Sequence, residues 1–213
     1  SPVAKWGGVA IVFASTDSYD VSVGDVVDIY GATDEFSYQG SLGGETRLQA
    51  TSVARTGQRE DLTPLPVADP AILADENLGE PYEGVLVRVS DVATQNGLES
   101  YGQFALTGGL IVDDTIYHHS AMPGETFTSI TGVIEYSAFA NGGFRLLPRS
   151  ADDVVTAGLG VVPEATVAQL RDPSADGYLT PCTFGDSACT PATRTIKNVV
   201  VTSPTFVLAK DST

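Results

Sequence analysis

An internal repeat constrains the fold of this chain more than any other feature. Residues 23–31, Val-Gly-Asp-Val-Val-Asp-Ile-Tyr-Gly, match residues 123–132, Pro-Gly-Glu-Thr-Phe-Thr-Ser-Ile-Thr-Gly, and the match continues downstream with an offset between 98 and 101. Self-similarity of this kind predicts two related supersecondary units. The matched positions are Gly24-Asp25 with Gly124-Glu125, Gly31 with Gly132, Glu35-Phe36 with Glu135-Tyr136, Gly43-Gly44 with Gly142-Gly143, and Arg47-Leu48 with Arg145-Leu146.

Each copy of the repeat is typical of β-structure. A Gly-acid turn leads into a strand that ends at a glycine, and a Gly-Gly hairpin then leads into a strand with Arg and Leu on opposite faces. Weak helical periodicity occurs only at residues 69–76 and 164–171. The whole chain is therefore predicted to be all-β, with short strands rich in Val, Ile, Phe, Tyr and Thr at 8–14, 26–30, 84–89, 103–107, 127–136, 145–147 and 196–201.

The repeat divides the chain into four parts. Residues 1–60 form a first β-unit, 61–81 a proline- and acid-rich connector, 82–155 a second β-unit, and 156–213 a linker, a cysteine loop and a final strand. The second unit opens with a strand at 83–90 that the first unit lacks, since residues 6–13 correspond to a second strand. Residues 195–209 read as a leading strand with no unit after it. The predicted core consists of Val26, Ile29, Leu48, Val85, Val87, Phe104, Ile130, Val133 and Leu146.

The two cysteines, Cys182 and Cys189, lie in a stretch full of turn-forming residues. This spacing favours a local disulfide. Two free thiols and a metal half-site are the alternatives, although structural zinc needs closer cysteine pairs and a second pair of ligands. A disulfide together with few lysines is typical of an exported protein in an oxidising space, so we expect an extracellular or cell-surface location after removal of a signal peptide.

The net charge of the chain disfavours one class of partner. The formal net charge is −16, with 27 acidic and 11 basic residues, so nucleic-acid binding is disfavoured because the surface repels phosphate. No apolar run is long enough for a membrane span. With 42% hydrophobic residues the chain can still bury a core.

Catalytic patterns are weak throughout. Ser41 is out of register with the Gly-x-Ser-x-Gly elbow, and the side chains of the adjacent His118 and His119 are expected to point in opposite directions. We therefore predict that the protein is not an enzyme and has no cofactor. Carboxylates could hold calcium at Asp113-Asp114, at Asp152-Asp153 or, slightly favoured, in the loop with Asp172 and Asp176, although none matches EF-hand spacing and a solvated acidic surface is the alternative.

Several of these patterns resemble the OB-fold-like domains associated with bacterial extracellular nucleases and other secreted hydrolases. The likeness rests on Trp-Gly-Gly-Val-Ala-Ile-Val-Phe at 6–13, on 21–31, on Glu-Gly-Val-Leu-Val-Arg at 83–88, and on Arg145-Leu146. The resemblance implies two tandem OB-like antiparallel β-barrel or sandwich units, the first without its leading strand, followed by a C-terminal extension that ends in an additional strand. It also implies an accessory rather than a catalytic role.

Two functions are compatible with these features. In the first, the chain is a secreted structural module whose C-terminal strand completes the first unit of a neighbouring copy, giving a head-to-tail filament or array. In the second, it is an accessory ligand- or nucleic-acid-binding module of a larger secreted hydrolase. A third alternative is that the C-terminal strand pairs with the first unit of its own chain. The assembly strand would use Ile196, Val199, Val201, Phe206 and Leu208, and the receptor strand Trp6, Val9, Ile11 and Phe13.

Overall fold

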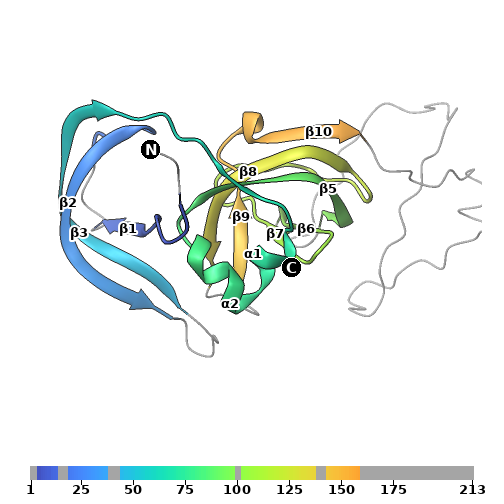
Figure 1. The fold of residues 1–213 in the computed structure, drawn as a ribbon, viewed down its shortest axis with the longest axis horizontal. Helices are drawn as coiled ribbons and strands as arrows, with labels where there is room; N and C mark the ends of the chain where they lie inside the picture. The colour runs from blue at the N-terminus through green and yellow to red at the C-terminus, as the bar shows by residue number, and fades with distance from the viewer. Residues whose placement is uncertain (1–3, 14–18, 38–43, 99–101, 138–142, 159–213) are drawn as a thin grey trace, which may run out of the picture. The chain divides into compact units, whose positions relative to one another are not determined.

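The computed structural model describes residues 4–13, 19–37, 44–98, 102–137 and 143–158, which all belong to a compact unit spanning Ser1–Gly160. The described chain consists mainly of β-strands with a few short helical turns, which confirms the all-β prediction (Figure 1). The segments that contain Cys182, Cys189, Asp172, Asp176 and the predicted assembly strand lie outside the described residues.

Five strands close into a barrel. Their order is β5-β6-β7-β9-β8, and β8 pairs back with β5. Neighbouring strands are antiparallel except for β7 and β9, which are parallel. Outside the ring, β10 pairs with β8 and β4 pairs with β5. The bounds are β4 (Leu65–Val67), β5 (Leu86–Leu98), β6 (Phe104–Leu106), β7 (Ile111–Val112), β8 (Thr126–Tyr136), β9 (Phe144–Leu147) and β10 (Val154–Gly158).

The barrel contains the hydrophobic core. Val85, just before β5, and Leu86 are both buried, and from Val87 onward Val87 and Val89 are buried while Arg88 and Ser90 are exposed, which is the period of two expected for a strand with one buried face. Each fully buried aliphatic or aromatic side chain contributes about 1.5–3 kcal/mol. The largest fully buried side chains are Phe104, Phe127, Leu73, Leu106, Leu110, Ile130, Ile134 and Leu146.

The connector contributes to this core. It contains β4, α1 (Ala71–Ala74), α2 (Glu76–Gly79) and the 3-10 turn η1 (Glu80–Tyr82), which is more regular structure than the weak helical periodicity at residues 69–76 indicates. The Asp75 side chain accepts hydrogen bonds from the N–H groups of Asn77 and Leu78, both at 2.9 Å, and so caps α2. Leu73 on α1 is fully buried in the core. A further 3-10 turn, η3 (Ala151–Asp153), precedes β10.

A separate three-stranded sheet precedes the connector. It consists of β1 (Ala10–Phe13), β2 (Asp25–Phe36) and β3 (Glu45–Arg59) in the order β1-β3-β2, with β1 parallel and β2 antiparallel to β3. Ala50 is the one residue of these three strands that is buried. The predicted core residues Val26, Ile29 and Leu48 are only half-buried, because no second layer within the described chain covers this sheet, and Val133 in the barrel is half-buried too. Val85, Val87, Phe104, Ile130 and Leu146 are buried as predicted.

The internal repeat is visible in the strand pairing. Gly24 and Gly124 both have positive φ, 92° and 70°, in the turns before β2 and β8. Ile29 pairs with Val53 on β3, and at an offset of 101 on both strands Ile130 pairs with Val154 on β10. The sheet therefore repeats part of the barrel in the same register.

The pairing also corrects two details of the sequence alignment. Asp34 lies opposite Arg47 as Glu135 lies opposite Arg145, so the expected match of Glu35 with Glu135 is wrong by one residue. The reason is that β2 and β8 still differ by 101 in residue number at this pair, whereas β3 and β9 differ by 98.

The second correction concerns β1. Ile11 pairs with Leu48 as Val112 pairs with Leu146, which makes β1 the counterpart of β7, the third strand of the barrel, rather than of the second. The strand also begins at Ala10, later than predicted, because Trp6 has a φ of 62° and therefore lies in a turn.

Candidate functional site

The candidate site is the outer edge of β2, the edge that faces away from β3. In the barrel, β8 uses the equivalent edge to pair with β5, from Leu86 opposite Val133 to Ala93 opposite Thr126. The matching stretch of β2, residues 25–32, has no strand on this edge within the described part of the chain. An unpaired edge presents backbone N–H and C=O groups to another strand. We call residues 25–32 the β2 open edge.

The side chains along the β2 open edge are patterned for burial. Burial alternates along β2 with a period of two from Asp28 to Ala32, and Val26 and Ile29 are half-buried. Their counterparts in the barrel, Phe127 and Ile130, are 1% and 0% exposed. The difference is that Phe127 and Ile130 lie in the core of the closed barrel, whereas no second layer within the described chain covers the sheet that contains β2.

A second edge is open on β1. Its counterpart β7 pairs with β6, where Phe104 lies opposite Val112, but β1 has no equivalent neighbour among the described strands. Ile11 and Phe13 are half-buried on β1, and the Phe13 ring lies 4.5 Å from the Tyr19 ring. β1 is only four residues long, so it offers a much shorter edge than β2.

The other two predicted receptor residues lie before the strand. Trp6 and Val9 are 71% and 46% exposed. The Trp6 N–H donates to the Pro81 carbonyl at 2.7 Å, and Lys5 Nζ lies 4.7 Å from the centroid of the Tyr82 ring. These contacts join the segment before β1 to the end of the connector, and they place neither Trp6 nor Val9 on a strand.

A buried carboxylate lies where β3 meets the residues before β5. Glu83 is only 8% exposed, its Oε1 has no hydrogen-bond partner, and its carboxylate accepts a hydrogen bond from the Thr46 N–H. Burial, with the nearby charges of Glu80, Glu35 and Glu45, raises the pKa of Glu83 to about 7. Sequence analysis missed this group, because nothing in its local sequence distinguishes it from a solvated glutamate.

Asp113 is the centre of a hydrogen-bonded cluster in the barrel. It is buried and accepts from Gln103 Nε2 at 2.5 Å, from the Thr115 N–H at 2.9 Å, from Thr115 Oγ1 at 2.5 Å and from Arg145 Nη1 at 2.8 Å. Burial alone would raise the pKa of Asp113, but the hydrogen bonds from Thr115 and Arg145 outweigh it and lower the pKa below its usual value. The Asp113 carboxylate therefore has a structural role.

The same holds for Asp153. It accepts from Arg149 Nε at 2.8 Å and from Arg149 Nη2 at 2.9 Å. These interactions outweigh burial and lower the pKa of Asp153. No group of three or more His, Cys, Asp or Glu side chains that could hold a metal ion occurs among the described residues, which include Asp113-Asp114 and Asp152-Asp153.

The two histidines differ in their surroundings. His118 is exposed and lies 3.2 Å from Asp114 Oδ2. His119 is half-buried: its Nε2 lies 3.1 Å from Glu125 Oε1, and its ring packs edge-on against Phe127 at 5.5 Å between ring centroids. The side chains have different partners, and both sets of contacts are structural.

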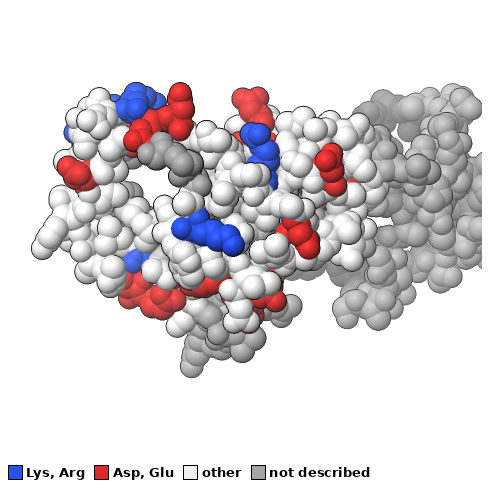
Figure 2. All heavy atoms as spheres, viewed as in Figure 1, with Lys and Arg blue, Asp and Glu red and all other residues white. Residues whose placement is uncertain are grey.

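The basic side chains of the described residues do not form a groove for a polyanion. Figure 2 shows acidic and basic residues scattered in small groups over one face of the described surface. Arg145 is paired with Asp113, Arg88 Nε donates to Thr131 Oγ1 at 3.1 Å, and Arg47 lies 3.6 Å from the centroid of the Phe36 ring. These cations are engaged within the fold.

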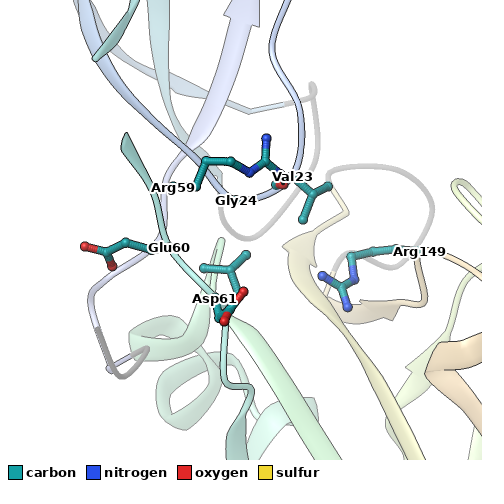
Figure 3. A pocket seen from close by; sticks show the side chains of 7 residues that line it. Val23, Gly24, Arg59, Glu60, Asp61 and Arg149 are labelled. Atoms are coloured by element: carbon teal, nitrogen blue, oxygen red, sulfur yellow. Dashed lines mark hydrogen bonds between the residues drawn. The ribbon is translucent and has the colours of Figure 1, made fainter. Parts of the chain in front are cut away.

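An open pocket of about 260 Å³ is lined by residues 23–24 and 59–62 and by Arg149 (Figure 3). Arg59 donates to Asp25 Oδ1 at 2.6 Å and to the Val23 carbonyl at 2.7 Å, and Arg149 is held by Asp153. Because both guanidinium groups already have acceptors, this pocket is a poor site for an anionic ligand.

Comparisons with known proteins add no further assignment. No protein-family model, no curated protein and no solved structure matches this chain. No helix in the described part of the chain is long and apolar enough to cross a membrane.

Proposed function

We propose that this protein is a non-catalytic structural module of the cell exterior that assembles by strand complementation. A C-terminal strand within residues 195–213 of one copy completes the three-stranded sheet of its neighbour. One observation carries the proposal. The sheet repeats β7, β8, β9 and β10 in the same register, yet counterparts of β5 and β6 are absent from the described residues before the connector.

The proposal includes a finer description of the fold. Both β-units are OB-like, the second complete and the first without counterparts of β5 and β6 among the described residues. The strand order of the barrel supports this, because five strands that pair as first-second-third-fifth-fourth-first, with the third parallel to the fifth, are arranged as in an OB-fold barrel. The resemblance to domains of secreted hydrolases agrees with the same arrangement.

The sequence indicates which segment is the donor strand. Residues 195–209 are rich in β-branched and apolar side chains, including Ile196, Val199, Val201, Phe206 and Leu208, and such a strand needs a partner. A head-to-tail contact between unlike surfaces propagates as a filament or closes into a ring. A polyanion-binding accessory role has less support, because the arginines of the barrel are already engaged.

The test is the oligomeric state as a function of concentration. We expect the full chain to form oligomers whose mass grows with concentration by light scattering, and a chain ending at residue 194 to remain monomeric. A full-length Val199→Asp, Val201→Asp variant keeps the chain length and should also fail to assemble. A full chain that stays monomeric at high concentration, or a truncated chain that assembles equally well, contradicts the proposal.

A further inference from the structure

We propose that the β2 open edge, rather than the edge of β1, receives the donor strand, and that residues 196–201 of a neighbouring copy pair with it antiparallel, with Lys197 opposite Asp28. This inference rests on the proposed function and specifies its interface. It replaces the receptor strand expected from the sequence at residues 6–13.

The first step is the choice of edge. β8 uses one edge for β9 and β10 and the other for β5. On β2 the first of these edges is already occupied along its length by β3, which pairs from Asp25 opposite Arg59 to Phe36 opposite Glu45. The remaining edge is the one on which a leading strand such as β5 sits. β1 corresponds instead to β7, whose free side takes the three-residue strand β6.

The second step is the register of the donor. Asp91 in β5 has a φ of 53°, a conformation that Asp and Asn tolerate better than most side chains. Residues 89–94, Val-Ser-Asp-Val-Ala-Thr, and residues 196–201, Ile-Lys-Asn-Val-Val-Val, align when Asn198 takes the place of Asp91. This alignment puts apolar Ile196, Val199 and Val201 at the positions of residues 89, 92 and 94, which are all buried in the barrel.

The third step transfers the pairing of the barrel to β2. Val89 lies opposite Ile130, Ser90 opposite Ser129 and Val92 opposite Phe127. Each β2 residue has a number 101 lower than its counterpart in β8, and each donor residue has a number 107 higher than its counterpart in β5. Ile196 therefore lies opposite Ile29, Lys197 opposite Asp28 and Val199 opposite Val26. The apolar pairs thus fall on the half-buried side chains of β2.

The charged pair is an independent agreement, because Asn198 alone sets the alignment. Asp28 is exposed and makes no ion pair with another described residue, and Lys197 is one of three lysines in the chain. Side chains directly opposite on antiparallel strands lie roughly 4.5–5.5 Å apart between Cβ atoms, within reach of an ion pair. The donor therefore complements both the apolar and the charged positions of the edge.

A charge-swap cycle tests this register. We expect Asp28→Lys and Lys197→Asp each to weaken the association constant about threefold to tenfold, and the double variant to recover it to within about twofold of the wild type. Asp61→Lys makes the same charge change at an exposed site away from the edge. On a chain of net charge −16 it reduces repulsion between copies, so it should leave association unchanged or strengthen it.

Hydrogen exchange provides a readout that needs no substitution. On assembly, amides of residues 25–32 should gain protection relative to the chain ending at residue 194, while those of residues 10–13 should not. Equal effects of Asp28→Lys and Asp61→Lys, no recovery in the double variant, or protection confined to residues 10–13 would each overturn the inference. Such a result leaves the proposed function intact as long as truncation abolishes assembly, whereas a monomeric full chain rejects both.

Discussion

The buried carboxylate of Glu83 gives the most direct test of how β3 contacts the barrel. Its pKa is raised from 4.5 to about 7, chiefly by burial and then by the charge of Glu80, and only the Thr46 N–H partly offsets this. Folded protein therefore binds more protons than unfolded protein between these two pH values. The free energy of unfolding should be highest below about pH 4.5 with respect to this group and should fall as pH rises through 7.

The size of the effect follows from the pKa shift. One pKa unit corresponds to 1.36 kcal/mol, so the rise from 4.5 to about 7 means that ionised Glu83 destabilises the folded state by at most about 3.4 kcal/mol above pH 7. We expect about 1–3 kcal/mol, because relaxation of the protein and penetration of water around a buried charge reduce the penalty. Glu83→Gln removes the charge and should therefore stabilise the protein by this amount at pH 8 and by little at pH 4.5.

Urea unfolding of the wild type and of Glu83→Gln at several pH values between 4.5 and 8 measures this difference. The pKa values of Glu45 and Glu135 are also raised, in both cases mainly by burial, so the difference between the two proteins, and not the wild-type curve alone, isolates Glu83. Glu76→Gln, at an exposed site in the first turn of α2, is the control and should change stability by less than about 0.5 kcal/mol. Parallel pH profiles for wild type and Glu83→Gln would refute the argument.

Two further substitutions test the barrel itself. Asp113→Ala leaves Arg145 without its carboxylate and should cost roughly 3 kcal/mol in urea unfolding near pH 7; because the pKa of Asp113 is lowered, the difference should shrink as pH falls below about 4. Gly132→Ala would place a Cβ 2.6 Å from the Leu147 carbonyl oxygen and should cost about 1–3 kcal/mol in thermal or urea unfolding, whereas Gly158→Ala, with its nearest neighbouring atom at 4.0 Å, should change little. Equal stability of the two glycine variants would contradict the close approach of β8 to β9.

The sequence predicted the strands whose side chains alternate clearly. β5 and β8 were located because their apolar residues recur on one face, and the repeat placed β2 and β8 in equivalent positions before any pairing was known. The full length of β3 was missed. Its second half is mostly polar, as in Ala-Arg-Thr-Gly-Gln-Arg at 54–59, because the sheet it belongs to has no buried layer, and an exposed strand leaves no hydrophobic period to detect.

The environments of the buried charged groups could not be predicted from the sequence either. Asp113 draws its partners from Gln103, Thr115 and Arg145, and Glu83 is buried by the approach of β3 from nearly forty positions earlier in the chain. Such environments form only when distant strands meet, so residue type and local spacing cannot reveal them. The equivalence of β1 with β7 could not be read from the sequence for a related reason, since only strand pairing shows it.

The open sheet also limits how tightly copies could associate. Full burial of an aliphatic side chain contributes about 1.5–3 kcal/mol, and the half-buried Val26 and Ile29 can recover only part of this when a strand covers them. Ile196, Val199 and Val201 of the donor would gain more, and each new backbone hydrogen bond adds about 0.5–1.5 kcal/mol. Association costs an estimated 4–15 kcal/mol and ordering the donor adds to this, so gain and cost are of the same order. A strand-complemented array of this chain should therefore be reversible on dilution, and polymers that persist at nanomolar concentration would require contacts beyond the β2 open edge.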